Sequence, residues 1–174
     1  IHWMKLTAHG RAGHGSMIND ENALTSIAEA VAKIGRYEWP QRYTKTVKAL
    51  FSKIAQVTGK KYDESDLRPL LSEIGPTARM IGATLQNTAN PTMLEAGYKA
   101  NVIPGSASAV IDGRFLPGHE DELNKTIREI IGPDILIETI SRDIALEIEF
   151  EGDLVEAMCK AITTFDPEGI PVPY

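Results

Sequence analysis

The chain has 174 residues, of which 43% are hydrophobic and 24% are charged, and it carries a formal net charge of −6. These values are typical of a globular domain with enough apolar residues for a core. The negative charge argues against nucleic acid or an anionic membrane surface as a partner, and no apolar run approaches the length of a membrane span.

The single cysteine, Cys159, cannot form a disulfide within the chain, so we expect a reducing, cytoplasmic location. It lies in the apolar stretch "LVEAMCKAI", which predicts a small core residue and not a nucleophile. The sequence opens inside a strand-like run and stops in what resembles the start of another strand. We therefore expect a segment of a longer protein.

The first predicted elements are a strand and a helix. Apolar residues alternate with polar ones in "MKLTA", which predicts a half-buried strand. The stretch "GRAGHGS" breaks this pattern. Asp20 is the predicted N-cap of a helix from about Glu21 to about Tyr37. Its apolar residues at helical spacing are Leu24, Ile27, Ala28, Val31 and Ile34.

Residues 40–85 are predicted to form a helical insertion. Pro40 ends the preceding element, and an amphipathic pattern then predicts a helix that stops near Gly59. Shorter helical patterns follow up to about Leu85.

Strand patterns return in "PTMLEAGYKANVI" and "SASAVIDGRFL", and the "PGS" between them predicts the tight turn of a hairpin. On the second strand, alternation predicts one face with Ala109, Ile111 and Phe115. The other face would hold Val110, Asp112 and Arg114.

The stretch "PGHEDELNKTIREIIG" predicts a helix that stops at Gly132, and "DILIETIS" predicts a final strand. The order β-α-β-β-α-β predicts an α+β ferredoxin-like sandwich over residues 1–143, with a four-stranded antiparallel sheet and two helices on one face. A further helix and the strand-like "IPVPY" follow, so residues 144–174 are expected to belong to a neighbouring domain.

The four histidines do not pair at the spacing of a zinc-binding helix, and no Cys-x-x-Cys is present. We therefore expect no metal ligand in this chain. The glycine run lacks the Gly-Lys-Ser/Thr of a phosphate loop and does not match the dinucleotide-binding fingerprint.

His14 has two interpretations. It is either a polar residue in an exposed turn, or an imidazole before a helix that donates a hydrogen bond to a developing oxyanion. The glycines beside it would allow a close approach of another molecule. His9 has only the first kind of interpretation, as a polar residue at the end of a strand.

Asn101 and Arg114 also have two interpretations each. Asn101 is a turn-forming residue or an amide that binds a carboxylate or carbonyl group. Arg114 is half of a surface ion pair with Asp112, or a planar fork for a substrate carboxylate.

Three ordered blocks carry a family resemblance: Gly-His-Gly-Ser, Asn-Val-Ile-Pro-Gly and Asp-x-Arg-x-x-Pro-Gly. They are similar to blocks in the lid, or dimerisation, domain of the zinc metallopeptidases that include aminoacylase, glutamate carboxypeptidase and succinyl-diaminopimelate desuccinylase. The resemblance covers residues 1–143 without the insertion.

This resemblance implies a parent enzyme that hydrolyses peptide or N-acyl amide bonds of small, carboxylate-bearing substrates. Its catalytic domain would hold two zinc ions and a glutamate base, and its lid would pair with the lid of a second subunit. The resemblance implies that His14 reaches the partner's active site and stabilises the oxyanion. It implies that Asn101 and Arg114 bind substrate, Arg114 through the substrate carboxylate.

The blocks that would hold zinc and the base are missing from this sequence, so the chain alone is expected to be inactive. The alternative is a stand-alone ferredoxin-like module that binds a small ligand or a protein, because a fold does not determine a function.

Overall fold

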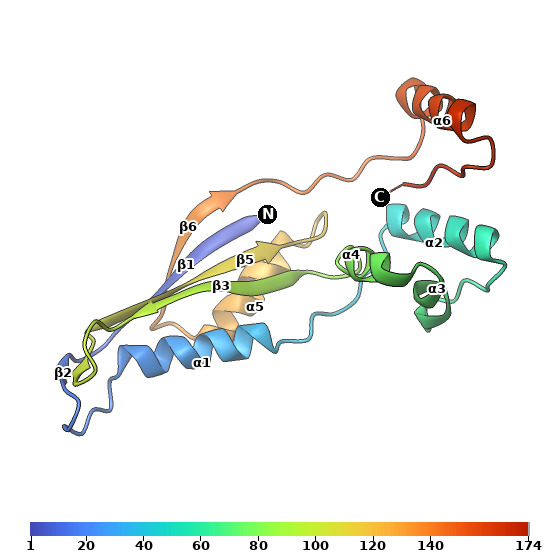
Figure 1. Cartoon of the computed structure of the whole chain (residues 1–174). Coiled ribbons are helices and arrows are strands. Elements are labelled where there is room, and N and C mark those ends of the chain that lie inside the picture. The colour runs from blue at the N-terminus through green and yellow to red at the C-terminus, as the bar shows by residue number, and fades with distance from the viewer. Residues whose placement is uncertain (174) are drawn as a thin grey trace. The chain divides into compact units, whose positions relative to one another are not determined.

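The structure is a computed structural model that describes residues 1–173. The chain divides into two compact units, Ile1–Pro40 with Asn87–Ala145, and Gln41–Gln86 with the residues from Leu146 onward. Figure 1 shows the elements of both units.

The first unit is a ferredoxin-like sandwich. Its strands pair antiparallel in the order β3-β5-β1-β6. Two helices, α1 and α5, cover one face of this sheet (Figure 1). The predicted fold class is therefore confirmed. The elements are β1 (His2–His9), α1 (Ala23–Gly35), β3 (Thr88–Ala96), β5 (Ser106–Arg114), α5 (Glu120–Ile131) and β6 (Leu136–Arg142).

Alternation along the strands decides which face the helices cover. On β1 the buried residues are His2, Met4, Leu6 and Ala8, while the residues between them are exposed or half-buried. On β5, Ala109 and Ile111, which were predicted to share one face, are both buried. Phe115 lies just beyond the strand and packs partly against the same core.

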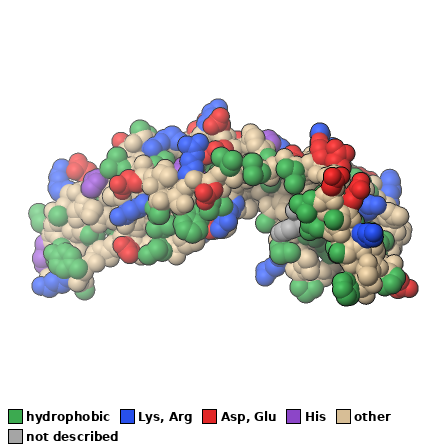
Figure 2. Space-filling model, turned by 90° about the horizontal axis from the view of Figure 1, so that it is seen from above, with side chains coloured by type: hydrophobic (Ala, Val, Ile, Leu, Met, Phe, Trp, Pro, Cys, Tyr) green, Lys and Arg blue, Asp and Glu red, His purple; other side chains and the backbone are tan. Residues whose placement is uncertain are grey.

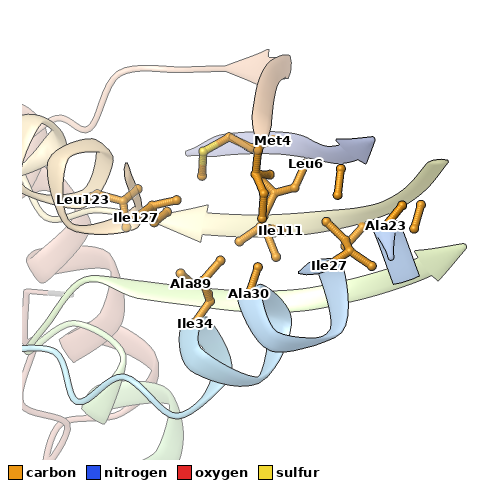
Figure 3. Close-up of a cluster of buried hydrophobic side chains, with 14 of the residues drawn as sticks. Met4, Leu6, Ala23, Ile27, Ala30, Ile34, Ala89, Ile111, Leu123 and Ile127 are labelled. Atoms are coloured by element: carbon orange, nitrogen blue, oxygen red, sulfur yellow. The ribbon is translucent and has the colours of Figure 1, made fainter. Parts of the chain in front are cut away.

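The core fills the layer between the sheet and the two helices (Figure 3). Ile27 and Ile34 of α1 and Leu123 and Ile127 of α5 are fully buried there, so each helix contributes one apolar face. This packing holds both helices against a single face of the sheet.

The predicted N-cap of the first helix is wrong. Asn22, not Asp20, caps α1, and its Oδ1 accepts hydrogen bonds from the backbone nitrogens of Leu24 and Thr25 at 3.0 and 3.4 Å. The preceding residues are held in the loop, because the backbone nitrogen of Arg11 donates to the Glu21 carbonyl at 2.8 Å. The helix therefore starts later than the local sequence pattern suggests.

The predicted hairpin is also different. β3 ends at Ala96, and Gly97 turns the chain with a positive φ of 69° that favours glycine. Residues 102–103 form the short strand β4 (Val102–Ile103), which pairs with β2 (Gly13–His14) in a separate two-stranded sheet. The connection between β3 and β5 is therefore the whole segment 97–105 and not the tight "PGS" turn.

The second unit has its own apolar core, built around Leu50, Phe51 and Leu70. Helix α2 ends before Gly59, as predicted. The prediction that Cys159 is a small core residue is wrong, because Cys159 is only half-buried on α6 and is not part of the core cluster. The elements of this unit are α2 (Lys45–Thr58), α3 (Arg68–Glu73), the 3-10 helix η1 (Gly75–Thr77), α4 (Ala78–Gly82) and α6 (Asp153–Phe165).

The predicted strand in "IPVPY" is not formed over residues 170–173, and Tyr174 lies outside the described residues. Within residues 1–173, none of the helices has both the length and the apolar character that crossing a membrane requires.

Gly10, at the end of β1, packs too closely against the start of α1 to accept a side chain. A Cβ there would overlap the Glu21 carbonyl oxygen and lie 2.6 Å from the Ala23 backbone nitrogen. Both neighbours are backbone atoms, so a side chain at position 10 could be accommodated only if the loop and the start of the helix moved. Gly13 in the same loop is open, because its nearest neighbour would be the Met17 sulfur at 3.9 Å.

We therefore expect Gly10→Ala to lower the free energy of unfolding by about 1–3 kcal/mol, the usual cost of overpacking. Gly13→Ala is the matched control and should change it by less than about 0.5 kcal/mol. Urea unfolding of both variants measures the difference. Equal midpoints for the two variants would contradict the close approach at Gly10.

Candidate functional site

The predicted catalytic residue, His14, lies on β2 beyond the end of β1, at one end of the sheet (Figure 1). Two loops meet there, residues 10–22 and 97–105. The backbone nitrogen of Gly10 donates to the Gly105 carbonyl at 3.0 Å, and that of Gly15 donates to the Asn101 carbonyl at 2.9 Å. These bonds and the β2–β4 pairing join the two loops into one structure.

The first loop is also cross-linked internally. The Asn19 side chain donates from Nδ2 to the Arg11 carbonyl at 2.6 Å, and its Oδ1 accepts from the Glu21 backbone nitrogen at 2.9 Å. His14 therefore sits on a hydrogen-bonded scaffold, although its side chain is exposed.

The structure brings His14 and Asn101 together. Asn101 Nδ2 lies 3.4 Å from His14 Nε2. On the other side of the ring, His14 Nδ1 lies 2.8 Å from Ser16 Oγ and 3.3 Å from the Ser16 backbone nitrogen. The result is an exposed cluster of one imidazole, one amide and one hydroxyl group, all able to donate or accept hydrogen bonds.

Arg114 is not part of this cluster. It ends β5, whose other end, Ser106, pairs with His9 beside the His14 loops. Eight strand steps separate the ends of β5, which corresponds to roughly 25 Å. Arg114 therefore lies at the opposite end of the sheet from His14.

The Arg114 guanidinium is bound by its strand neighbour Asp112. Its Nε and Nη2 donate to the two carboxylate oxygens of Asp112 at 2.6 and 2.9 Å. The hydrogen bonds from Arg114 hold the pKa of Asp112 below its usual value. Asp112 occupies one edge of the guanidinium, and Nη1 lies on the other edge.

The Arg114 end of the sheet is also where the chain enters and leaves it. Thr88, the first residue of β3, pairs with Arg114. His2, at the start of β1, pairs with Gly113 on β5 and with Arg142 at the end of β6. Apart from the loops near His14 and the loops that flank α5, all connections between the sheet and the rest of the chain are therefore at the Arg114 end.

Two further residues show what the sequence interpretation missed. Ser16 belongs to the Gly-His-Gly-Ser block, but the sequence interpretation did not predict its contact with His14. Its position two residues after a turn histidine is a local signal for such a contact. His2 is buried and bridges three elements, with Nδ1 2.8 Å from Asn124 Oδ1 and Nε2 2.9 Å from Thr139 Oγ1. His9 is exposed at the end of β1.

Among residues 1–173, no group of three or more His, Cys, Asp or Glu side chains is arranged to hold a metal ion. The described residues therefore offer no site that fits the catalytic zinc that the resemblance implies. On the face that Figure 2 shows, basic and acidic side chains are interspersed with hydrophobic ones.

The sequence matches a model of the peptidase dimerisation domain over residues 1–136. It is also 30% identical over 136 residues to a probable carboxypeptidase S-like protein of Dictyostelium discoideum. That match covers 72% of this chain and 26% of the relative, so the chain spans about a quarter of the curated protein that it resembles.

Two solved structures are similar in fold. A metallo-carboxypeptidase of the M20 family from Sulfolobus solfataricus aligns with 99% of this chain and 50% of its own, at a TM-score of 0.60 and 15% identity. The dipeptidase Dug1p from Saccharomyces cerevisiae aligns with 99% of this chain and 41% of its own, at a TM-score of 0.63 and 13% identity. At these identities the likeness concerns the fold alone. The sequence match and the ferredoxin-like sandwich together show that the chain belongs to the peptidase dimerisation domain family of the M20 metallopeptidases.

Proposed function

We propose that this chain comes from a longer zinc-dependent enzyme that hydrolyses peptide or N-acyl amide bonds. Residues 1–143 would be its lid and dimerisation domain, with the helical insertion at about 40–85, and residues 144–174 would belong to the flanking catalytic domain. The zinc ligands and the general base would lie outside this chain. The observation that carries the proposal is the pairing of His14 with Asn101 on a scaffold of two joined loops.

Exposed apolar side chains after residue 143 support the proposed flanking domain. Alternating residues from Ile144 to Phe150 are exposed. Along α6, Leu154, Met158 and Ile162 form a second exposed apolar stripe at helical spacing. Apolar surfaces of this kind are usually covered by another part of the protein.

His14 would stabilise the negative charge that develops on the carbonyl oxygen when water attacks the amide. An imidazole N–H held in position on a rigid loop can donate a hydrogen bond to that oxygen. Asn101 beside it would contact the same substrate with its amide group. Both side chains are exposed, as they must be if they complete a site formed by another part of the protein.

The separation of His14 and Arg114 determines how such a site would be assembled. A small substrate cannot bridge roughly 25 Å, so the two residues of one subunit cannot contact the same molecule. Arg114 lies where the chain enters and leaves the sheet, which is next to the catalytic domain of its own subunit under this proposal. His14, at the far end, would therefore serve the catalytic domain of the partner subunit.

The surface formed by β3 and α1 is the best candidate for the homodimer interface. β3 is an edge strand, and its residues from Thr92 to Ala96 are exposed. Leu94 pairs with the inward-facing Ala109, so it points to the helix side of the sheet and is 53% exposed there. An unpaired edge with exposed apolar residues favours pairing with a second copy.

The neighbouring face of α1 continues this apolar surface. Leu24, Ala28, Val31 and Gly35 recur at helical spacing, and the Cα of Gly35 faces the Pro91 ring of β3 closely enough for a Cβ to be 3.7 Å from it. Leu24 is 40% exposed and Ala28 is also exposed. Two copies related by a two-fold axis could pair both their β3 edges and their α1 faces.

His14→Ala in the full-length enzyme should lower kcat by about 10²–10³, because it removes one oxyanion donor. Dimer mass and metal content should not change, because the residue is exposed and holds no metal. A kinetic assay against N-acyl amino acids and dipeptides with a free carboxylate measures the effect, and the nearby His9→Ala is the control. An unchanged kcat for His14→Ala would refute the assignment.

A mixed dimer tests whether the two subunits share a site. When one subunit carries His14→Ala and the other carries Arg114→Ala, one site keeps both side chains and the second loses both. We therefore expect about half of the wild-type activity in purified mixed dimers, although each homodimer is nearly inactive. If both residues act within their own subunit, each site has one lesion and the mixed dimer is as inactive as the homodimers.

Leu94→Arg should shift the dimer toward monomers, because it places a charge on the proposed interface. Leu136→Arg is a matched control, since Leu136 is 52% exposed on the other edge strand, β6. Analytical ultracentrifugation over a range of concentrations measures both variants. Dissociation caused by Leu136→Arg alone would place the interface at β6 instead.

A further inference from the structure

The two ring nitrogens of His14 lie in different surroundings. Nδ1 faces Ser16 twice, through the hydroxyl at 2.8 Å and through the backbone nitrogen at 3.3 Å. Nε2 points away from Ser16 and faces the Asn101 amide at 3.4 Å. This asymmetry determines where the proton of the neutral imidazole lies.

The backbone nitrogen of Ser16 shows which way the hydrogen bonds to Nδ1 run, and the Ser16 hydroxyl makes the shorter contact. A backbone N–H can only donate, so Nδ1 must offer a lone pair to it. The Ser16 hydroxyl can donate or accept, and it must also donate once Nδ1 carries no proton. Both contacts therefore favour the tautomer in which the proton is on Nε2.

The backbone holds Ser16 in this position. The Met17 backbone nitrogen donates to the His14 carbonyl at 3.0 Å, which closes a turn over residues 14–17. The β2–β4 pairing of His14 with Val102 and the bond from Gly15 to Asn101 anchor that turn to the second loop. The contact between Ser16 and the ring thus follows from the fold of the loop.

The Asn101 amide is compatible with a proton on Nε2. Its oxygen and nitrogen exchange places by a half-turn of the amide group. With the oxygen toward the ring, Asn101 accepts a hydrogen bond from Nε2–H. With the nitrogen toward the ring, Nδ2 can donate only to an Nε2 that carries no proton, so the Nε2–H tautomer requires the amide with its oxygen toward the ring.

We propose that Ser16 is a positioning residue that holds His14 as the Nε2–H tautomer and so presents an N–H group to the substrate oxyanion. The inference rests on the proposed function of His14. In the other tautomer, Nε2 would carry a lone pair, which repels an oxyanion and cannot stabilise it. Ser16 touches no reacting atom and acts only through the ring of His14.

The tautomer can be measured directly by nitrogen NMR of the histidine-labelled chain. The wild-type spectrum should show His14 protonated at Nε2 and unprotonated at Nδ1. Ser16→Ala removes the 2.8 Å hydroxyl contact and keeps only the longer backbone contact, so it should raise the population of the Nδ1–H tautomer. Ser16→Thr, which keeps the hydroxyl, should show the wild-type population. Ser52→Ala, at an exposed position on α2, is the matched control and should leave the spectrum of His14 unchanged.

The kinetic arm uses the full-length enzyme. Ser16→Ala should lower kcat about three- to tenfold, the usual effect of one neutral hydrogen bond, and leave KM and dimer mass unchanged. Adding Ser16→Ala to His14→Ala should cause no further loss, because Ser16 acts through His14.

The outcomes separate this inference from the function on which it rests. A wild-type Nδ1–H tautomer, an unchanged tautomer in Ser16→Ala, or an additive loss in the double variant would overturn the role of Ser16. If His14→Ala leaves kcat unchanged, the proposed function fails, and the NMR result alone decides whether Ser16 sets the tautomer.

Discussion

The backbone pairing of two loops at one end of the sheet is the constraint on which the candidate site depends. Gly10 bonds to Gly105, Gly15 bonds to Asn101, and β2 pairs with β4. Exposed polar side chains such as His14 and Asn101 have little packing to hold them, so their backbone must be held instead. Hydrogen bonds between the loops do this without covering the side chains, which leaves them accessible to another molecule.

The length of β5 has an equally direct consequence. The strand connects the His14 loops to Arg114, and because an extended strand is stiff it keeps the two groups at opposite ends of the sheet. Under the proposed function, such a domain would contribute to two catalytic sites and would complete neither by itself. The proposed dimerisation through β3 and α1 would then be part of the catalytic arrangement and not only a means of stabilisation.

Local patterns predicted most of the fold because the physical signals are local. Alternation in β1 and β5 and the apolar faces of α1 and α5 follow from which residues can be buried. The prediction of the helix start failed because two neighbouring residues are equally suitable as its N-cap. Asp20 and Asn22 are both good N-caps, and the loop hydrogen bond between Arg11 and Glu21 selects the later one.

The candidate site likewise has a part that the sequence predicted and a part that it did not. The motifs around His14, Asn101 and Arg114 singled out these residues. The contact between Ser16 and His14 could also have been inferred, because the two residues are only two positions apart in a turn. The meeting of His14 with Asn101 has no local signal, since 87 residues separate them. Segment 97–105 could have extended β3, but it pairs with the first loop instead.

The sequence by itself therefore determined the order of elements, the apolar faces and the choice of candidate site residues, because periodicity and residue type are properties of neighbouring residues. Only the tertiary structure decided which of those side chains share a site. That choice depends on hydrogen bonds between distant loops, which place Asn101 beside His14, and on the span of one strand, which keeps Arg114 away from both.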